Sequence, residues 1–450
     1  MADILVPRDP VPVRPSENRY LAGNMAPVER EITSFDLPVT GRIPEELEGR
    51  WLRNGPNPPP SADPSTQHWF TGAGMVHGVR LQGGAARWYR NRYVLPDGEF
   101  GPNTSVGGFA GTTWALVEAG AQPVELSYEL ESRGPNGFSG TLPGPFTAHP
   151  KYDPATGELH AVAYHWPDLV DHVQYVVVGG DGRVSKVVDV PVPDMPMIHD
   201  MSLTERYAVV YDLPVTVRLE VMGDGIPWPF AWNPDHAPRV GLLPRDGTAD
   251  DITWCDVDPC FVFHPLNAYD ADDGTVVVDV CRYDRMMVED RLGPFGDSLP
   301  TFDRWVIDPA ARRVHETRLD DRPQEFPRHD PRVGLRRHRY GYTSELTPEA
   351  ANLHGAILKI DVEAGTTEAH EFGPGRGGAE PVVVPKADSV AEDDCWILTV
   401  VYDAATDGSE LCILDAADIT GPEVARVALP QRVPYGFHGN WVSDDSVAPA

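Results

Sequence analysis

Four histidines stand in short motifs of similar make-up, each after an apolar or aromatic approach and before polar residues. The motifs are FTAHPKYDPATGE at His149, MIHDMSLTERYAV at His199, FVFHPLNAYDADDG at His264 and PYGFHGNWV at His438. Neutral imidazole binds iron, zinc, copper and nickel. Another common iron site, with two histidines and one carboxylate, usually begins with an H-x-[DE] triplet. The sequence contains no such triplet, although Asp200 directly follows His199.

The other histidines need no functional explanation from the sequence. His160, His165 and His172 are close together, but they fall across an expected strand and loop, with no helix to align them. We expect surface or partly buried structural roles for them, and also for His315, His329, His338, His354 and His370.

The chain that must position the four histidines is rich in short β-type runs. Examples of such runs are residues 158–166, 207–213, 275–284 and 396–404. Asp/Gly turns join several neighbouring runs, as in YDPATGEL, GGDGRV, IDPAARRV and IDVEAGTT. Asp and Gly accept the backbone angles of tight reversals. The 46 prolines and 42 glycines lie largely between the runs. The pattern therefore predicts an all-β protein with almost no long amphipathic helix.

The spacing of polar residues favours a radial arrangement of blades. His149, His199 and His264 follow one another at intervals of 50 and 65 residues, and two glutamates divide the long gap to His438. These glutamates are Glu325 and Glu380, and all the resulting intervals lie between 50 and 65 residues. Such a period suits one propeller blade with its loops, and 450 residues accommodate about seven blades. We expect equivalent positions in successive blades to converge on the central axis.

Composition excludes several classes of partner. The formal net charge is −31 at pH 7, which repels nucleic-acid phosphates, so we expect no nucleic-acid binding. Nothing resembles a signal peptide or an apolar span of membrane length. Five cysteines without paired C-x-x-C spacing predict reduced thiols and a cytoplasmic location. The sequence indicates no obligate protein partner. Residues 1–30 are rich in proline and predict an extended arm, followed by one domain over 31–450.

The sequence as a whole resembles the carotenoid cleavage oxygenase family from about Leu37 to Val442. The fragments that carry the resemblance occur in the family's order. They are LPVTGRIPEELEGRWLRNGPNP, HWFTGAGMVHGVRL, WYRNRYV, ALVEAGAQPVEL, TAHPKYDPATGE, MIHDMSLTE, WNPDHAPRVGLLPR, FHPLNAYD, RYGYT, GGAEPVVVP and GFHGNW. The resemblance implies a seven-bladed β-propeller with ferrous iron on its axis. It also implies a dome of long loops that encloses a tunnel over the iron-bearing face.

The resemblance assigns roles to particular residues. It makes His149, His199, His264 and His438 the ligands of one Fe(II) per chain. It also makes three glutamates acceptors of hydrogen bonds from ligand imidazoles, an arrangement that fixes ring orientation and offsets the metal charge. These glutamates are Glu118, Glu325 and Glu380. The implied reaction is cleavage of a conjugated double bond by O2 to two carbonyl products, without flavin or nicotinamide. No dinucleotide-binding fingerprint contradicts this.

The residue before Glu118 bears on the substrate. Family members that cleave hydroxylated stilbenes typically carry a lysine there, whereas this chain has Val117. A hydrophobic carotenoid or apocarotenoid polyene is therefore the expected substrate, and a stilbene or phenylpropanoid of the lignostilbene type is the alternative. Aromatic residues beside family motifs are expected to line the tunnel. They are Trp69, Phe70, Tyr269, Tyr435 and Phe437.

A proline-rich aromatic run between His199 and His264 gives two opposite interpretations. Its apolar residues are Ile226, Trp228, Phe230 and Trp232. Prolines at 227 and 229 predict a loop. Such a loop could rim the tunnel mouth and contact a membrane peripherally, or it could fold inward and cap the core.

Proteins of other functional classes would show other motifs than those in this sequence. A calcium-dependent propeller hydrolase would need converging carboxylates, and a protein-binding propeller would show regular WD-type repeats. Within the family, an isomerohydrolase acting on retinyl esters is a further alternative.

Overall fold

The computed structural model describes residues 18–95, 101–347 and 354–446. Over these residues the regular structure is β-strand, interrupted by short 3-10 turns. The turns are η1 (Arg19–Leu21), η2 (Gly23–Met25), η4 (Leu219–Asp224), η5 (Ala249–Asp251), η6 (Pro331–Val333) and η7 (Ala416–Asp418). None of these described helical segments has the length and apolar character needed to cross a membrane. The predicted all-β class is confirmed.

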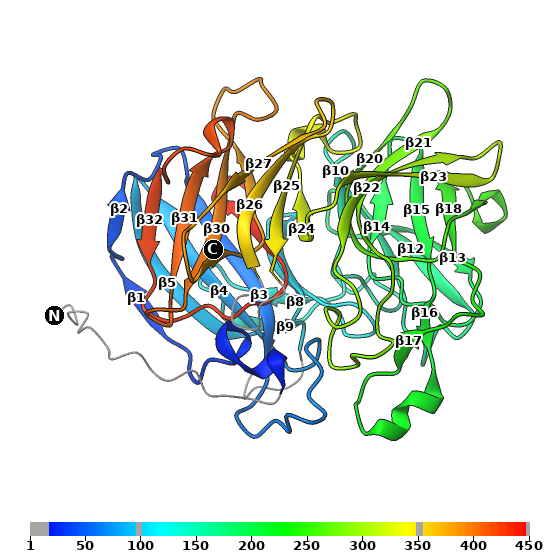
Figure 1. The fold of residues 1–450 in the computed structure, drawn as a ribbon, viewed down its shortest axis with the longest axis horizontal. Coiled ribbons are helices and arrows are strands. Elements are labelled where there is room, and N and C mark those ends of the chain that lie inside the picture. The colour runs from blue at the N-terminus through cyan, green and yellow to red at the C-terminus, as the bar shows by residue number, and fades with distance from the viewer. Residues whose placement is uncertain (1–17, 96–100, 348–353, 447–450) are drawn as a thin grey trace.

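The strands form sheets of mostly antiparallel neighbours, arranged like propeller blades (Figure 1). The first sheet has the order β1 (Thr33–Phe35), β5 (Ala85–Tyr93), β4 (Ala73–Gln82), β3 (Gly49–Asn57), β33 (Gly439–Ser443). The second is β6 (Ser105–Phe109), β7 (Thr112–Leu116), β8 (Val124–Leu126), β9 (Ser132–Pro135). The third is β10 (Lys151–Asp153), β11 (Glu158–Ala163), β12 (His172–Val178), β13 (Val184–Pro191).

An eight-stranded sheet occupies the middle of the chain. Its order is β14 (Met201–Leu203), β15 (Tyr207–Asp212), β18 (Arg239–Pro244), β19 (Thr253–Asp256), β23 (Arg313–Asp320), β22 (Thr301–Asp308), β21 (Val276–Tyr283), β20 (Phe261–Asp270). Two antiparallel halves meet there at a single parallel pair, Asp256 with Arg313. A separate two-stranded ribbon joins β16 (Val215–Val217) to β17 (Phe230–Trp232).

The remaining sheets come from the C-terminal third. One has the order β24 (Gln324–Arg328), β25 (Tyr340–Leu346), β26 (His354–Asp361), β27 (Thr366–His370). The other is β2 (Val39–Gly41), β32 (Ala425–Ala428), β31 (Gly408–Asp415), β30 (Cys395–Asp403), β28 (Arg376–Gly378), with β29 (Val382–Pro385) also on β30.

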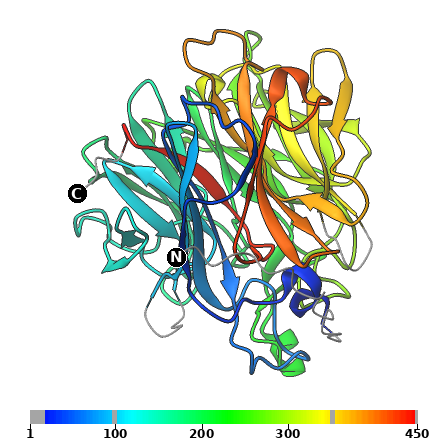
Figure 2. The same ribbon diagram turned by 90° about the vertical axis from the view of Figure 1, so that its left-hand side faces the viewer.

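The two ends of the chain close the ring of sheets. The C-terminal β33 pairs with β3, and the N-terminal β2 pairs with β32. Figure 2 shows the red C-terminal strand among the blue and cyan N-terminal strands. Each of these sheets therefore contains strands from both ends of the chain, so the ring is held shut by backbone hydrogen bonds.

The turns predicted from Asp and Gly join the expected strands. The pairs β10–β11, β12–β13, β22–β23 and β26–β27 are all antiparallel hairpins. Gly157 and Gly365 have φ of 73° and 66°, conformations that glycine adopts without a steric penalty.

The innermost strands of successive sheets contact one another around the axis. Neighbouring pairs include β33 with β6, β10 with β14, β14 with β20, and β20 with β24. All six residues with the 50–65-residue period lie on or just before such a strand, since β29 also contacts β33. They are His149 before β10, His199 before β14, His264 in β20, Glu325 in β24, Glu380 before β29 and His438 before β33. The predicted equivalence of these positions explains how distant segments reach one centre.

Residues at the start of the described chain pack against the domain. Tyr20 is 2% exposed and stacks on Trp69, with ring centroids 5.7 Å apart. The rest of the predicted arm, residues 1–17, lies outside the described residues. All five cysteines lie within the described part of the chain, buried and free, as reduced thiols require.

Candidate metal centre

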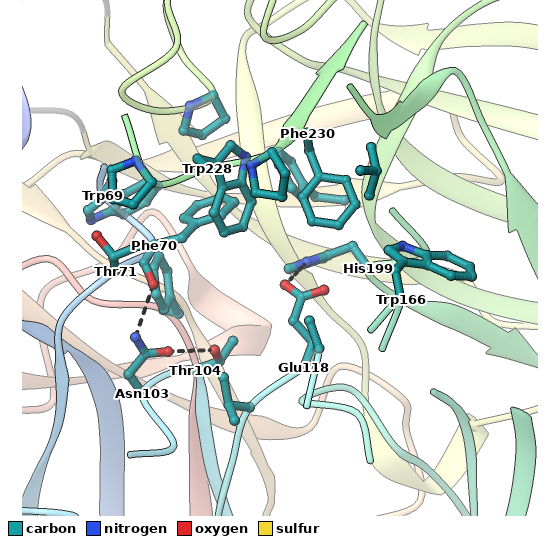
Figure 3. Close-up of a pocket in the computed structure, with 18 of the residues that line it drawn as sticks. Trp69, Phe70, Thr71, Asn103, Thr104, Glu118, Trp166, His199, Trp228 and Phe230 are labelled. Atoms are coloured by element: carbon teal, nitrogen blue, oxygen red, sulfur yellow. Dashed lines mark hydrogen bonds and ion pairs between the residues drawn. The ribbon is translucent and has the colours of Figure 1, made fainter. Parts of the chain in front are cut away.

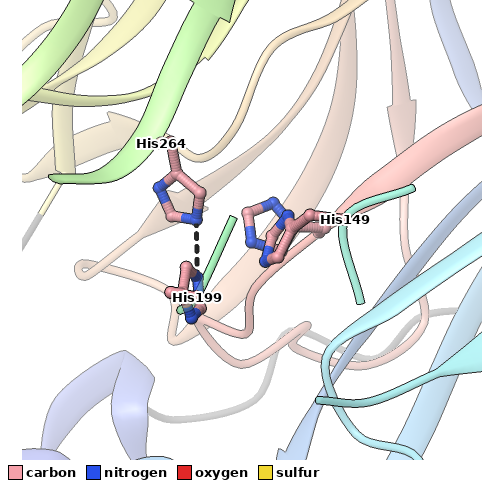
Figure 4. A group of neighbouring side chains, drawn as sticks. His149, His199 and His264 are labelled. Carbon is pink, nitrogen blue, oxygen red and sulfur yellow. Dashed lines mark hydrogen bonds between the residues drawn. The ribbon is translucent and has the colours of Figure 1, made fainter. Parts of the chain in front are cut away.

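Four buried imidazoles meet where the innermost strands converge. One nitrogen from each of His149, His199, His264 and His438 lies within 4.8 Å of the others. Figure 4 shows the rings of the three labelled histidines turned toward a common point. Among the described residues no other group of His, Cys, Asp or Glu meets the same criterion for a metal site.

Three of these imidazoles are oriented by glutamates, of which Glu325 and Glu380 are buried and Glu118 is partly buried. The Nδ1 atoms of His199, His264 and His438 lie 2.6, 2.6 and 2.8 Å from carboxylate oxygens. The partners are Glu118, Glu325 and Glu380, in that order. An ionised carboxylate accepts a hydrogen bond from Nδ1–H, so the Nε2 atom of each ring keeps its lone pair and faces the centre.

The Nε2 atoms are arranged for a cation. Nε2 of His199 and Nε2 of His264 are only 3.1 Å apart, and with both Nδ1 protons donated to carboxylates neither nitrogen can donate to the other. Nε2 of His149 is buried without a hydrogen-bond partner. An unsatisfied buried acceptor costs about 1–3 kcal/mol. A metal ion accepting all these lone pairs removes both problems, so the residues fit a metal site.

Burial keeps three of the imidazoles neutral. Burial lowers the pKa of His438 to about 3, and burial also holds the pKa values of His149 and His264 well below the ordinary value. Neutral imidazole is the form that binds metal.

The glutamates differ in their surroundings. Burial raises the pKa of Glu325 to about 8 in the metal-free protein, and a cation among the imidazoles would favour its ionised form. Burial would also raise the pKa of Glu380, but Arg328 and His438 hold it well below the usual range.

His149 is held differently from the other three. Its Nδ1 lies 3.9 Å from a carboxylate oxygen of Asp200, which is beyond hydrogen-bond length. Asp200 is itself buried and accepts a hydrogen bond of 2.8 Å from Lys151. The fourth imidazole therefore lacks the direct carboxylate support of its neighbours.

Local backbone strain aims one aromatic ring at the centre. Phe326 has φ of 57°, and a bulge interrupts the pairing of its strand β24 with β25. Its N–H donates to Glu325, and its ring packs 5.5 Å from the ring of His264 and 5.4 Å from that of His438. Strained non-glycine residues persist where the surrounding packing imposes them, often at functional sites.

A large, mostly apolar cavity of about 650 Å³ opens beside the histidines (Figure 3). Of the tunnel residues predicted from sequence, Trp69, Phe70, Val117 and Phe437 line it. The other two lie elsewhere. Tyr435 packs on His354 and Tyr402, and Tyr269 packs on His338.

Sequence reasoning missed several lining residues. They are His165, Trp166, Met195, Phe263, Phe295 and Phe326. His165, for which we expected only a structural role, is thus among the residues that line the cavity. One available signal was its place in YHWPD directly after β11, which ends at Ala163.

The aromatic run at 226–232 points inward. Ile226 and Phe230 are 8% and 4% exposed. Trp228 lines the cavity, stacks on His68 at 4.3 Å and donates from Nε1 to the Met287 sulfur at 3.3 Å. Two large apolar side chains just before the run do face outward: Leu219 is 71% exposed and Met222 is 40% exposed. Leu219 also lines the cavity, which places it at the mouth.

Comparisons with known proteins agree with this geometry. The family model described as RPE65, retinal pigment epithelial membrane protein, matches residues 25–99 and 101–443. A carotenoid cleavage oxygenase of Mycobacterium tuberculosis is 43% identical over 95% of this chain and 98% of its own.

Two solved structures share the fold over nearly the whole chain. A lignostilbene dioxygenase of Pseudomonas brassicacearum has a TM-score of 0.87 at 28% identity, covering 96% of this chain and 100% of its own. A cobalt-substituted Synechocystis apocarotenoid oxygenase has a TM-score of 0.81 at 27% identity, covering 93% and 97%.

Replacing a predicted ligand should remove the metal without unfolding the chain. We expect His438→Ala and His199→Ala to lose nearly all bound metal, because each removes one of four donors. Metal analysis of protein purified without chelator, with circular dichroism for folding, measures this. The exposed His315 provides the control variant His315→Ala. Full metal occupancy in both ligand variants would contradict the assignment.

Removing one carboxylate charge should weaken the centre while preserving its shape. Glu380→Gln deprives the Nδ1–H of His438 of its ionised acceptor. We expect metal affinity to fall about 10–100-fold, the usual effect of losing such a partner. Competition with a chelator measures the affinity, and the exposed Glu371 supplies the matched control Glu371→Gln. Unchanged metal affinity in Glu380→Gln would show that the charge of Glu380 does not contribute to metal binding.

Proposed function

The chain belongs to the RPE65 family of carotenoid oxygenases, and from this premise we propose that it is a non-haem Fe(II) dioxygenase. It uses O2 to cleave a conjugated C=C bond of a carotenoid or apocarotenoid to two aldehyde or ketone products. The observation that carries the proposal is the cluster of four buried histidines beside a large apolar cavity.

The cofactor is one Fe(II) per chain, held by His149, His199, His264 and His438. Bound iron would supply the site at which dioxygen is activated. Four neutral donors leave the charge of the ion uncompensated. That charge is offset by the carboxylates that accept hydrogen bonds from the ligand imidazoles, namely Glu118, Glu325 and Glu380.

The protein's own contribution is binding, orientation and charge stabilisation. The apolar cavity excludes water from a polyene and aligns it along His199, His264 and His438, all of which line the cavity. The ring of Phe263 lies 4.7 Å from that of His199, and Phe70 packs against the same imidazole. Aromatic faces so close to the reacting carbons can stabilise positive charge that develops along the conjugated chain.

A neutral polyene is favoured over a phenolic substrate. Val117 lines the cavity where a lysine would grip a phenol oxygen, and no Lys or Arg is among the described lining residues. A charged side chain at position 117 would lose hydration beside a hydrocarbon substrate, which costs free energy. The alternative is cleavage of a stilbene, which the structural likeness to a lignostilbene dioxygenase keeps open.

The architecture that supports this function is a seven-bladed β-propeller with a dome of loops over the iron-bearing face. In this proposal the eight-stranded sheet counts as two blades, since its halves share only the pair Asp256–Arg313. Residues 31–450 then form a single oxygenase domain, preceded by the N-terminal arm over 1–30.

We assign the protein to the cytoplasm, because its five cysteines are free thiols. A peripheral membrane contact would deliver the water-insoluble substrate. In the sequence-based form of this proposal the contact is made by Ile226, Trp228, Phe230 and Trp232. The burial of Ile226 and Phe230 favours a revised form, in which Leu219 and Met222 at the mouth make the contact.

Labelled oxygen tests the reaction itself. Iron-loaded enzyme incubated with ¹⁸O2 and an apocarotenal should give two carbonyl fragments, each carrying label, as mass spectrometry would detect. A panel containing a hydroxystilbene tests the substrate class. Faster cleavage of the stilbene than of every polyene would support the alternative, and no cleavage of either would refute the proposed function.

Paired variants test the two forms of the membrane contact. Leu219→Ser with Met222→Ser should leave the melting temperature unchanged and slow cleavage of carotenoid in liposomes more than in detergent. Trp228→Ser with Phe230→Ser should lower the melting temperature by several degrees, because packed aromatic rings are lost. Val390, 96% exposed and outside the cavity lining, gives the control Val390→Ser. Equal liposome rates in the first pair and the wild type would contradict the revised contact.

A further inference from the structure

Two of the three glutamates beside the metal centre are held by backbone donors. Glu325 accepts the N–H of Phe326, and Glu380 accepts the N–H of Gly439 at 2.7 Å. Glu380 also accepts a hydrogen bond of 3.0 Å from Arg328. These two carboxylates therefore keep a fixed partner on the main chain besides the imidazole that each one orients.

Glu118 has no backbone donor within the described part of the chain. It follows strand β7, which ends at Leu116, and the next residue, Ala119, has φ of 58°. Its carboxylate makes two hydrogen bonds to described residues, and they use different oxygens. Nδ1 of His199 lies 2.6 Å from Oε1, and the hydroxyl of Tyr164 donates to Oε2 at 2.7 Å. Figure 3 shows the first of these bonds.

The side chain of Tyr164 is enclosed by other aromatic rings. Tyr164 directly follows strand β11, which ends at Ala163, and it is 1% exposed. Its ring centroid lies 5.7 Å from that of Trp166 and 6.0 Å from that of Phe230. A phenol oxygen moves only with its ring, so this packing gives the hydroxyl one position. Tyr164 is absent from the lining of the large cavity and does not contact a substrate there.

The two hydrogen bonds of Glu118 together fix the plane of its carboxylate. A carboxylate held at one oxygen can turn about its Cγ–Cδ bond, whereas partners on both oxygens prevent that rotation. With Oε2 held by Tyr164, Oε1 faces Nδ1 of His199, and the Nε2 of that imidazole faces the centre. Supporting hydrogen bonds of this kind decide how closely a metal site keeps its geometry.

We propose that Tyr164 is a positioning residue of the metal centre. Its hydroxyl fixes the carboxylate of Glu118, which in turn holds the imidazole of His199 in the orientation that a metal ion requires. The inference rests on the metal site of the proposed function and not on the reaction. Tyr283 also donates to a glutamate, Glu325, at 3.2 Å, but there the main chain gives further support. The centre should therefore depend more on Tyr164 than on Tyr283.

Binding of Co(II) to metal-free protein tests the proposal without turnover. Competition with a chelator gives the affinity, and the visible absorption of Co(II) reports the geometry of its ligands. We expect Tyr164→Phe to bind Co(II) about tenfold less tightly, at the lower end of the effect of losing an outer partner, and to change the absorption spectrum. Tyr283→Phe should lose less affinity, because Glu325 keeps the N–H of Phe326.

A second buried tyrosine provides the matched control. Tyr175 is fully buried in strand β12, and its hydroxyl lies 2.7 Å from Nδ1 of His160, away from the four ligands. Tyr175→Phe also removes a buried hydroxyl group, yet it should keep the wild-type affinity and spectrum. Melting curves of the metal-free proteins show whether each variant is folded.

A double-mutant cycle tests whether Tyr164 acts through Glu118. In a Glu118→Ala background the hydroxyl has no carboxylate to hold, so adding Tyr164→Phe should cause no further loss of Co(II) affinity. Proton NMR of the Co(II) protein gives a second measurement, because the metal shifts the Nδ1–H resonances of its ligand imidazoles out of the crowded region. Tyr164→Phe should speed the solvent exchange of the one resonance that Glu118→Ala also alters, which is that of His199.

Three results would overturn the proposal: wild-type affinity in Tyr164→Phe, an equal loss in Tyr175→Phe, or a loss that persists in the Glu118→Ala background. The third result would show a folding defect that does not need Glu118. A larger loss in Tyr283→Phe than in Tyr164→Phe would also contradict it. Co(II) results as expected, with no cleavage of polyene or stilbene by the iron-loaded enzyme, would refute the proposed reaction and leave the role of Tyr164 standing.

Discussion

The structure depends on bringing four imidazole lone pairs to one point. Two of them, on His199 and His264, are 3.1 Å apart, and lone pairs at that distance repel unless a cation lies between them. When Glu118 and Glu325 are ionised they accept hydrogen bonds from the two Nδ1–H groups, and neither imidazole can then donate from Nε2 to the other. The outer carboxylates therefore do more than offset charge. They make the four converging imidazole lone pairs unfavourable without a metal ion, and a bound ion accepts those lone pairs.

Such an arrangement needs a scaffold that does not relax, and the ring of sheets supplies it. Each ligand comes from a different innermost strand or the residues just before it, so no local rearrangement can move the four imidazoles apart together. His438 sits directly before β33, the strand that pairs with β3 to close the ring. The strand pairing that closes the ring therefore also positions the fourth ligand. Sites on rigid strands are held more closely than sites on loops.

The centre lies between two cavities of different character. The larger, apolar cavity touches His199, His264 and His438, whereas a smaller cavity of about 370 Å³ touches His149, His264 and His438. Lys151 lines the smaller one, and the Asp200 that it pairs with faces His149. His199 therefore borders only the larger cavity and His149 only the smaller one, while His264 and His438 lie between the two. The charged groups beside the centre are divided in the same way: Glu118 and Glu325 line the larger cavity, whereas Glu380, Lys151 and Asp200 line the smaller one.

Sequence reasoning reached the features that repeat or that depend on residue type. The Asp/Gly hairpins and the 50–65-residue spacing predicted sheets that bring His149 and Glu325 together, although 176 residues separate them. It did not reach features that depend on packing between distant segments. The left-handed backbone conformation of Phe326 accompanies the bulge in β24, and no residue pattern in PQEFP predicts it.

The aromatic run at 226–232 shows in physical terms why burial could not be predicted from the local sequence. Its composition suits both a membrane contact and a core, because an aromatic side chain gains free energy by leaving water in either case. What decides is whether a partner is available inside the fold. Trp228 finds His68 and Met287, which lie 160 positions before it and 59 after it, and these contacts direct the ring into the cavity. The side chains left without such partners are Leu219 and Met222, whose short turn offered no pattern to single them out. Whether an apolar side chain is exposed therefore depends on the packing partners that distant segments provide. The local sequence shows only that the segment carries apolar surface to be covered.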